Sequence, residues 1–406
     1  MKAGDLRKDF PVLDRKINGK KITYLDNAAT SLKPRQVIDA EKYYYENVGA
    51  NVNRGLHALS EEASIAYEGA HDTVGKFVGA KREEVVFVRN ATEALNLVMY
   101  SLLNSDYFKK GDRIVVSKME HHSNIVPWQF LEKKVGVRLE YVGLTGNYEV
   151  DMADFEAKVR GAKLVSFSGA SNTVATVPDL RKIEKLTHKE GALFCVDGAQ
   201  LVPHKEVDFR GMNADFLAFS GHKMCAPTGT GALVGKKQLL GELSPFMFGG
   251  DMIHSVQWHD SSWNTLPQKY EAGTPNIGGA YGLKAACDYL GKIGFRFIEE
   301  QERKLTGLCI DELKKIDSVK MYCPMDEKKQ DAIVMFESTK LGAHDLAMAL
   351  SETENICIRS GMHCAEPLVS GINKDGLARA SFYFYNTEEE VLFFANTLRE
   401  ILNTFG

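Results

Sequence analysis

Residues 179–200 read DLRKIEKLTHKEGALFCVDGAQ, a helix-like segment followed by a short apolar run and then by polar residues. The same alternation extends from about residue 20 to about residue 235. The apolar runs lie at 21–26, 84–88, 112–117, 162–168, 192–197, 215–220 and 231–235, and the helix-like stretches at 35–47, 92–103, 124–134 and 179–191. Strands that alternate with helices predict an α/β fold with a mostly parallel sheet that is covered on both faces.

The rest of the chain departs from this pattern. Residues 241–279 are rich in glycine, aromatic and turn-forming residues, and a loop of this length is usually functional. Residues 280–316 form a long helical pattern, and short apolar runs at 331–337 and 377–385 predict a smaller α+β domain after it. The last helix begins with a capping box, Thr387 and Glu390. Its predicted buried face is Val391, Phe394, Ala395, Leu398 and Leu402.

Composition narrows the class of protein. The 406 residues are enough for two or three domains, and 44% apolar with 26% charged residues is ordinary for a globular enzyme. The net charge of −4 disfavours binding to nucleic acid or to an anionic membrane surface. The N-terminus is charged and lacks an apolar signal core, and no apolar run reaches the roughly 18 residues of a membrane helix. We therefore expect a cytoplasmic protein.

One of the seven cysteines stands apart from the others. Their odd number and the lack of a CxxC pair predict neither a disulfide framework nor a zinc site. Cys195, Cys357, Cys287 and Cys309 lie in strand-like or helix-like patterns, where a cysteine is usually a small buried hydrophobe. Cys364 lies instead in the turn-prone loop IRSGMHCAEP, residues 358–367, next to a histidine. A reactive thiol is one interpretation of that position.

Polar residues follow several of the apolar runs, and ligands collect at the carboxyl ends of parallel strands. Asp197 and Gln200 follow one run, and Ser220, His222 and Lys223 follow the next. Ala91 and Thr92 lie at a strand-to-helix junction, where backbone amides can bind an anion. Taken singly, Asp197 or Thr92 is equally typical of a helix cap, and Lys223 is equally typical of a lysine on a solvated surface.

A further strand end carries His121 and His122. Adjacent histidines in a strand point in opposite directions and no third ligand is placed near them, so we expect no metal site. A Schiff-base lysine, an acid for a pyridinium nitrogen, an aromatic ring for stacking and an anion site for a phosphate together describe a pyridoxal 5′-phosphate (PLP) site.

The chain resembles the class V, fold-type I PLP enzymes, and within them the group II (SufS-like) cysteine desulfurases and the related selenocysteine lyases. The resemblance covers nearly the whole chain. It rests, in order, on YLDNAATSLKP, NVNRGLHALS, RNATEALNLV, EHHSNIVPWQ, VDGAQ, SGHKMCAPTGTG, YEAGTPNI, RSGMHCAEP and RASFYFYN. It implies a large PLP-binding domain with a mostly parallel seven-stranded sheet, at 21–290. A small α+β domain at 291–406 would carry the Cys364 loop, and a segment at 1–20 would pack with that small domain.

The resemblance also implies roles for single residues. Lys223 would bind PLP covalently, Asp197 would pair with the pyridinium nitrogen, Gln200 would touch the ring oxygen, and His121 would stack on the ring and relay protons. The phosphate would lie on Ala91, Thr92, Ser220 and His222, and on Thr274 of a neighbouring subunit, which implies a homodimer. Asn172 and Arg379 would hold the substrate carboxylate, His57 and Arg359 would line the entrance, and Cys364 would be the nucleophile.

By this resemblance the protein converts L-cysteine to L-alanine and leaves a persulfide on Cys364. Arg359 and His363 could raise the fraction of thiolate. The sulfur would pass to an acceptor or scaffold protein of a Suf-type system and serve iron–sulfur cluster assembly. Group II loops usually read Arg-x-Gly-His-His-Cys, and Met362 replaces the first of these histidines here. The alternatives are a selenocysteine lyase or cysteine sulfinate desulfinase with the same site, an aminotransferase, and a catalytically silent sulfur carrier or assembly subunit.

Overall fold

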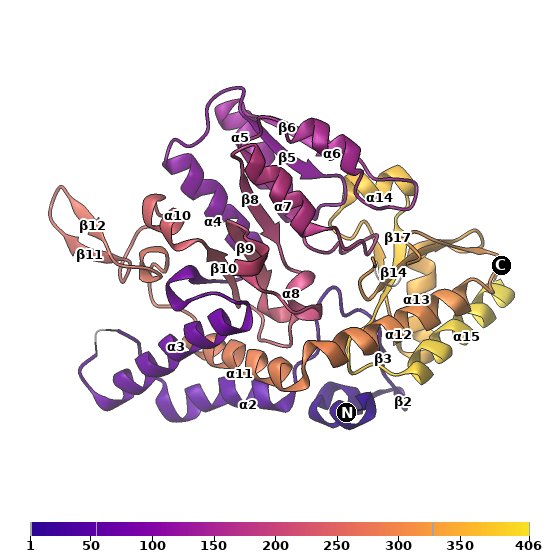
Figure 1. The fold of residues 1–406 in the computed structure, drawn as a ribbon. Helices are drawn as coiled ribbons and strands as arrows, with labels where there is room; N and C mark the ends of the chain where they lie inside the picture. The colour runs from indigo at the N-terminus through magenta and orange to yellow at the C-terminus, as the bar shows by residue number, and fades with distance from the viewer. Residues whose placement is uncertain (1, 54, 327–328, 406) are drawn as a thin grey trace.

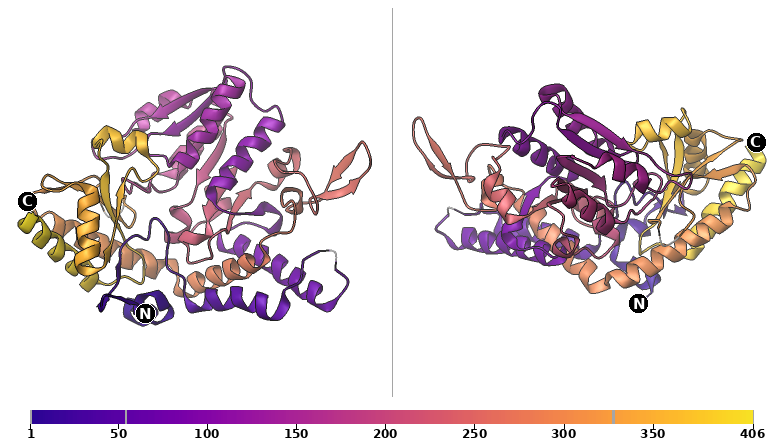
Figure 2. Two further views of the ribbon diagram at one scale, coloured as in Figure 1. Left: turned by 180° about the vertical axis from the view of Figure 1, so that it is seen from behind. Right: turned by 45° about the horizontal axis from the view of Figure 1, so that its top comes forward.

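The computed structural model describes residues 2–53, 55–326 and 329–405, so that Arg54 of the motif NVNRGLHALS lies outside the described residues (Figures 1 and 2). Its centre is a seven-stranded sheet in the order β4-β10-β9-β8-β7-β5-β6. The strands are β4 (Val85–Val88), β10 (Gly231–Gly235), β9 (Phe216–Ser220), β8 (Leu193–Asp197), β7 (Leu164–Ser168), β5 (Arg113–Ser117) and β6 (Arg138–Val142). Only β10 runs antiparallel to its neighbours in this sheet. The predicted mostly parallel seven-stranded sheet is therefore confirmed.

One predicted strand lies elsewhere. The run at 21–26 contributes β3 (Thr23–Tyr24), which pairs with β15 (Ile356–Cys357) in a separate two-stranded sheet. The seventh place in the large sheet belongs to β6, which the apolar pattern did not indicate. β6 is an edge strand, Arg138 at its start is exposed, and the residues after it are half-buried until Val142. An edge strand can be polar because one of its sides faces solvent.

Helices cover both faces of the large sheet. They are α2 (Arg35–Tyr43), α3 (Ala58–Phe77), α4 (Ala91–Asn104), α5 (Val126–Val135), α6 (Met152–Lys158), α7 (Leu180–Lys189), α8 (Leu201–His204), α9 (Phe209–Met212), α10 (Lys237–Glu242) and α11 (Ile277–Ile293). Along β8, Phe194 and Val196 belong to the core cluster of α6, α7 and α11, whereas Cys195 belongs to that of α4 and α5. Successive side chains of a strand point to opposite faces, so both faces of this strand are buried.

The large sheet gives a prediction of stability. The side chain of Phe167 in β7 is fully buried and packs against Phe155, with ring centroids 5.4 Å apart. Phe167→Ala should lower the free energy of unfolding by about 3–5 kcal/mol, because the cavity left behind adds to the lost burial. Urea unfolding measures the loss. Phe393→Ala, at a 40% exposed position, is the control and should change stability by less than about 0.5 kcal/mol. Equal losses in the two variants would contradict this.

A second, four-stranded antiparallel sheet has the order β13-β14-β17-β16 and lies beside the large sheet (Figure 1). Its strands are β13 (Val319–Met321), β14 (Ile333–Ser338), β17 (Leu377–Ser381) and β16 (Arg359–Gly361). The helices near it are α12 (Phe295–Leu313), α13 (Ala343–Glu354), α14 (Glu366–Ile372) and α15 (Glu388–Phe405). The long helical pattern is two helices, α11 and α12, separated at Gly294, whose φ of 83° favours glycine.

The start of α15 is as predicted. The backbone N–H of Thr387 donates to Glu390 Oε2 over 3.1 Å, and the N–H of Glu390 donates to Thr387 Oγ1 over 3.4 Å. The five residues of the predicted apolar face are all buried. The capping box and the apolar face of this helix are therefore confirmed.

The remaining segments lie at the periphery. Near the N-terminus are α1 (Ala3–Leu6) and the two-stranded sheet of β1 (Lys16–Ile17) and β2 (Lys20–Lys21). The predicted long loop contains a hairpin of β11 (Ile253–Val256) and β12 (Ser261–Trp263), which projects from the body of the molecule (Figure 1). Trp258 at the hairpin turn is 98% exposed. Among the helices of the described residues, none has the length and apolar character to cross a membrane.

Candidate active site

A cavity of about 280 Å³ lies at the carboxyl ends of the parallel strands, where β16 and β17 of the small sheet face them. Most of the predicted site residues line it: Ala91, Thr92, His121, Asn172, Asp197, Gln200, Ser220, His222, Lys223, Arg359, Cys364 and Arg379. The cavity thus brings together residues that lie almost 290 positions apart in the sequence, from Ala91 to Arg379. Ala28, Ala29, Asn90, Ser123, Ser168, Ala170, Ala199 and His363 complete its walls.

Lys223 and Asp197 lie at the ends of neighbouring strands. Lys223 closes the 3₁₀ turn Gly221–Lys223 directly after β9, and Asp197 is the last residue of β8. Burial lowers the pKa of Lys223 to about 8, although the charge of Asp197 opposes this effect. Burial raises the pKa of Asp197. Two smaller effects lower it: the N–H of Ala199 donates to its Oδ1 over 3.0 Å, and the charge of Lys223 favours the carboxylate. A buried carboxyl group beside an amine of lowered pKa is the arrangement that a Schiff-base cofactor needs.

The N-terminus of α4 opens onto the same cavity. The side chain of Asn90 caps this helix by accepting from the N–H of Glu93 over 3.0 Å, and the N–H of Ala91 donates to Ser220 Oγ over 2.9 Å. Thr92 Oγ1 and Ser123 Oγ are 2.7 Å apart. Hydroxyl groups around the positive end of a helix form a site suited to a phosphate.

His121 and His122 follow the end of β5, as predicted, but they lie at a 3₁₀ turn, His122–Asn124, and not within an extended strand. The N–H of Ser123 donates to His121 Nδ1 over 3.1 Å. Burial, together with the charge of Lys223, lowers the pKa of His121 to about 3, so that its ring is neutral. A neutral imidazole at the cavity wall is a suitable surface for an aromatic ring to stack on.

His122 turns instead toward the Cys364 loop. Its ring Nε2 accepts the backbone N–H of Glu366 over 2.9 Å, and the backbone N–H of His122 donates to the carbonyl of Cys364 over 2.7 Å. Both bonds hold the loop on the C-terminal side of the thiol, at Cys364 and Glu366. No local pattern predicts this role of His122, because the loop that it holds is more than 240 residues away.

The Cys364 loop is exposed and at the same time well anchored. Cys364 is the one cysteine of the described residues that is exposed; Cys357 is half-buried and the other five are buried. His363 and Cys364 both have left-handed backbone conformations, with φ of 51° and 54°. Asn172 Nδ2 donates to the carbonyl of His363 over 2.8 Å. These contacts hold the thiol at the rim of the cavity.

The surroundings of His363 do not support a role for it in raising the thiolate fraction of Cys364. His363 is 8% exposed, and its Nε2 donates to the carbonyl of Leu377 over 2.8 Å. Burial and the neighbouring charge of Arg379 lower the pKa of His363 to about 3, so the ring is neutral. Met362, which replaces the usual histidine, packs against an apolar cluster that includes Met335, Val369 and Leu377. The departure from the usual loop sequence therefore gives the loop an apolar anchor.

Two arginines meet at Asp26. Arg359 donates to Asp26 through Nε at 3.1 Å and a terminal nitrogen at 2.9 Å, and Arg379 lies 3.4 Å from the same carboxylate. Arg379 also donates to the carbonyl of Asn172 over 2.8 Å, while its Nε has no partner among the described residues. Burial lowers the pKa of Arg379 to about 10, which leaves it charged at neutral pH. A charged arginine of 2% exposure at a cavity wall is suited to a carboxylate.

His57 and Thr274 do not line this cavity. His57 is exposed and accepts the N–H of Ser60 over 3.4 Å at the start of α3. Thr274 is exposed, accepts from Asn51 Nδ2 over 3.4 Å, and lines a second cavity of about 400 Å³. Neither residue therefore lines the candidate active-site cavity of its own chain.

The cavity residues fit PLP. Gln200 is 2% exposed and donates through Nε2 to the carbonyl of Ala28 over 2.8 Å, but its Oε1 has no partner in the described part of the chain. A buried amide oxygen without a partner at a cavity wall needs a donor from a ligand. The lysine, the buried carboxyl group, the neutral ring and the anion site complete the set of groups that PLP requires.

Comparisons with known proteins agree with this geometry. The profile described as "Aminotransferase class-V" matches residues 23–394. A cysteine desulfurase of Haloferax volcanii is 43% identical over 401 residues, which cover 95% of this chain and 93% of that protein. The apo structure of a cysteine desulfurase from Thermococcus onnurineus NA1 superposes with a TM-score of 0.94 at 40% identity, covering 98% of each chain. The Escherichia coli cysteine desulfurase CsdA gives a TM-score of 0.91 at 31% identity, with both chains fully covered. This chain belongs to the class-V aminotransferase family.

Proposed function

We propose that this protein is a PLP-dependent cysteine desulfurase, which converts L-cysteine to L-alanine and keeps the sulfur as a persulfide on Cys364. The observation that carries the proposal is the exposed Cys364 thiol at the rim of a cavity whose walls include Lys223 and Asp197. A thiol that served only packing would be buried, as most of the other cysteines are.

The chain's residues divide the work of holding the cofactor. Lys223 would bind PLP through its amine, Asp197 would hold the proton on the pyridine nitrogen, and His121 would lie against the ring. The N-terminus of α4, with Thr92, would hold the phosphate. PLP, when bound, supplies an electron sink that weakens the bonds at the substrate's Cα.

Substrate binding falls to two further residues, and proton transfer falls to Lys223. Arg379 and Asn172 would hold the carboxylate of L-cysteine, which orients the Cα–H bond. Lys223, released from the cofactor by the substrate, would carry the Cα proton, since an amine whose pKa is about 8 exchanges protons readily near neutral pH. The proton returns to carbon in the product alanine.

The sulfur transfer balances without an added oxidant. The Cys364 thiolate attacks the substrate sulfur, an S–S bond forms as the C–S bond breaks, and the electron pair of the broken bond takes up a proton at carbon. Arg359, a cation of the cavity wall, interacts electrostatically with Cys364, although Asp26 already binds its guanidinium group. The persulfide would then pass to an acceptor or scaffold protein of a Suf-type system for iron–sulfur cluster assembly.

A homodimer and a two-domain chain are parts of the same proposal. Thr274 and His57 lie on the surface and would reach the site of the other subunit. The large domain would span 21–290 and the small domain 291–406, close to the break between α11 and α12 at Gly294. The segment 1–20 would pack with the small domain, which is supported by the 2.9 Å ion pair of Arg7 with Glu390 and by the packing of Phe10 on Phe384.

The direct test is to treat the purified holoenzyme with L-cysteine and to measure alanine and the mass of the Cys364 peptide. The proposal expects one added sulfur on Cys364 and an equal amount of alanine in a single turnover. Alanine without any sulfur on the protein would favour a lyase that releases the leaving group directly, as in the selenocysteine lyase and cysteine sulfinate desulfinase alternatives.

The lowered pKa of Lys223 gives a prediction of pH dependence. Only a neutral amine attacks the aldehyde of PLP, so the rate at which the cofactor-free protein captures PLP should rise with pH and level off above about 8. A lysine of the ordinary pKa of 10.5 would show a rate that still rises above pH 9. Stopped-flow absorbance measures the rate, and Nα-acetyl-lysine in the same buffers corrects for ionisation of PLP itself. A profile parallel to that of the free lysine would overturn the assignment.

The contacts of His122 give a prediction of positioning. His122→Ala removes the acceptor of the Glu366 N–H and should lower kcat about three- to tenfold, the effect of one hydrogen bond, while PLP absorbance is unchanged. His122→Gln keeps an acceptor and should recover part of the rate. Steady-state kinetics and the absorbance spectrum check both variants. Loss of bound PLP in His122→Ala would show instead that His122 supports the cofactor site.

A further inference from the structure

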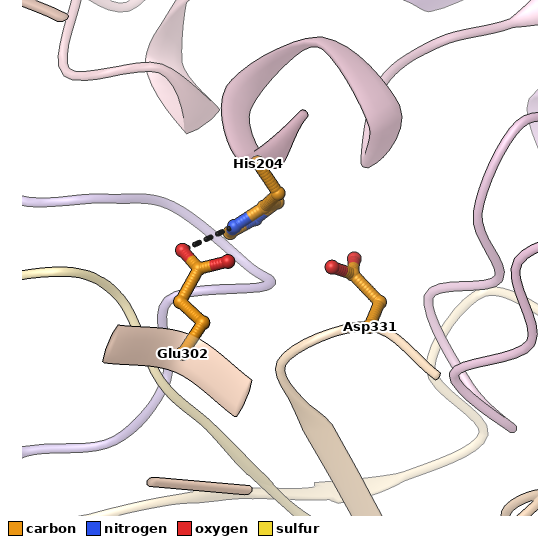
Figure 3. Close-up of side chains that lie close together, drawn as sticks. All are labelled: His204, Glu302 and Asp331. Atoms are coloured by element: carbon orange, nitrogen blue, oxygen red, sulfur yellow. Dashed lines mark hydrogen bonds and ion pairs between the residues drawn. The ribbon is translucent and has the colours of Figure 1, made fainter. Parts of the chain in front are cut away.

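A buried cluster of His204, Glu302 and Asp331 lies apart from the candidate active site (Figure 3). His204 ends α8, Glu302 lies in α12, and Asp331 precedes β14, so three separate segments supply the side chains. Their potential ligand atoms all lie within 4.8 Å of one another. The three residues are 4%, 5% and 3% exposed, respectively.

The cluster has unused acceptor atoms. His204 Nδ1 and Glu302 Oε1 are 2.8 Å apart, but Asp331 Oδ2 has no hydrogen-bond partner among the described residues. Figure 3 shows the Asp331 carboxylate pointing toward the other two side chains without joining their hydrogen bond. A buried carboxylate oxygen without a donor is costly, so this atom requires a ligand that the described chain does not supply.

An adjoining cavity supplies an independent observation. It has a volume of about 110 Å³, and Glu302 and Asp331 lie in its wall with Thr306 and Gln330. Thr306 Oγ1 and Gln330 Oε1 are buried and also lack partners within the described chain, and both residues are at most 5% exposed. Thr306 lies one helical turn after Glu302, so both face the same space. The cavity wall therefore includes three residues with unsatisfied oxygen atoms, next to Glu302, the hydrogen-bond partner of the imidazole.

The charges of the neighbourhood favour a cation. Two carboxyl groups face one imidazole, and burial of unpaired negative charge is unfavourable. Two cationic residues, Lys205 and Arg303, also line the cavity. The Lys205 ammonium group pairs with Glu299 over 3.6 Å, and Arg303 is exposed to solvent. Imidazole nitrogen with carboxylate oxygen is a ligand set suited to Zn²⁺ and to similar divalent transition metals.

We propose that His204, Glu302 and Asp331 form a structural site for a divalent cation of the Zn²⁺ class. In a tetrahedral Zn²⁺ site with bonds of about 2.1 Å the ligand atoms lie about 3.4 Å apart. The observed separations, from 2.8 Å to at most 4.8 Å, bracket that value, so small side-chain rotations bring the three atoms into place. The fourth position faces the cavity, where water or Gln330 Oε1 can complete the shell.

Such an ion would join the large sheet to the small one. His204 lies in α8, which follows β8 of the large sheet, whereas Asp331 leads into β14 of the small sheet. The two sides already meet here, because the N–H of Asp331 donates to the carbonyl of Ala175, in the segment after β7, over 2.7 Å. The Tyr383 hydroxyl donates to the carbonyl of Pro203 in the same region over 2.9 Å. A metal bound by side chains from both sides of this junction stabilises the folded state by its binding free energy.

The test uses PLP-loaded holoenzyme with the Cys364→Ser substitution, so that the exposed thiol cannot bind zinc. After removal of metal with a chelator, titration with Zn²⁺ alone is followed by isothermal calorimetry and by thermal unfolding. We expect one ion per chain and a rise in Tm. X-ray absorption at the zinc edge should show only nitrogen and oxygen ligands.

Matched variants assign the site. Asp331→Asn and His204→Gln keep the size of the side chains and should weaken Zn²⁺ binding by more than about tenfold, since even loss of a residue that only supports a ligand costs that much. Glu299→Gln lines the same cavity but is not a ligand, and it should bind Zn²⁺ like the parent. The proposal is overturned if the folded parent does not bind Zn²⁺, or if Asp331→Asn and Glu299→Gln bind it equally. None of these readouts depends on enzymatic activity.

Discussion

Lys223→Ala should yield a folded protein that binds PLP without a covalent link and has lost desulfurase activity. In the wild type, borohydride reduction should fix PLP permanently to the peptide that contains Lys223, and in the variant no peptide should carry it. The rate of alanine formation should fall by more than about 10³-fold, because in the proposed mechanism the same amine also moves the Cα proton. Absorbance spectra, peptide mass spectrometry and an alanine assay measure the three effects.

Lys269 offers a matched control for this variant. It is also a buried lysine, 7% exposed, whose pKa burial lowers, but its amine donates to the carbonyls of Leu240 and Gly241 outside the active-site cavity. Lys269→Met should keep the covalent PLP even if its stability falls. If Lys223→Ala retained PLP that borohydride fixes to the protein, another amine would be the attachment point and the assignment would fail.

The sheet was predictable where burial determines the sequence. β7, β8 and β9 are buried on both faces, so their residues form continuous apolar runs that stand out without any other information. β6 could not be found in this way, because an edge strand keeps charged and half-buried residues. The run at 21–26 was placed in the wrong sheet because Leu25 is buried in the core of the small sheet, a contact with residues more than 280 positions later.

The same distinction holds for the site. Asp197 ends a strand, and Lys223 and Thr92 lie within four residues after one, so the rule of strand ends was enough to bring them together. Asp26 has the same kind of signal, a carboxylate after an apolar run, but its role depends on two arginines from the far end of the chain. The neutral state of His363 depends on burial beneath β17, which no local pattern reveals.

Cys364→Ala should keep the PLP absorbance and lose alanine formation from L-cysteine. The thiol lies at the rim of the cavity and makes no contact that the cofactor needs, so its loss should leave PLP binding unchanged. Without a nucleophile for the substrate sulfur, the C–S bond cannot break by transfer, and the rate should fall by more than about 10³-fold. Cys364→Ser should behave in the same way, because an unactivated hydroxyl is a much weaker nucleophile than a thiolate.

Cys357→Ser is the control for that experiment. Cys357 lies in the strand that leads into the same loop, but it is half-buried and burial raises the pKa of its thiol, so it should not accept sulfur. The control should form alanine and a persulfide on Cys364 at rates close to wild type. If Cys364→Ala desulfurated L-cysteine at full rate, the nucleophile would be another group.

If Cys364→Ala lost activity on cysteine but kept activity on selenocysteine, the leaving group would decide whether the thiol is needed, because selenide leaves without being attacked. The site would then be that of a selenocysteine lyase, in which Cys364 serves only the sulfur substrate.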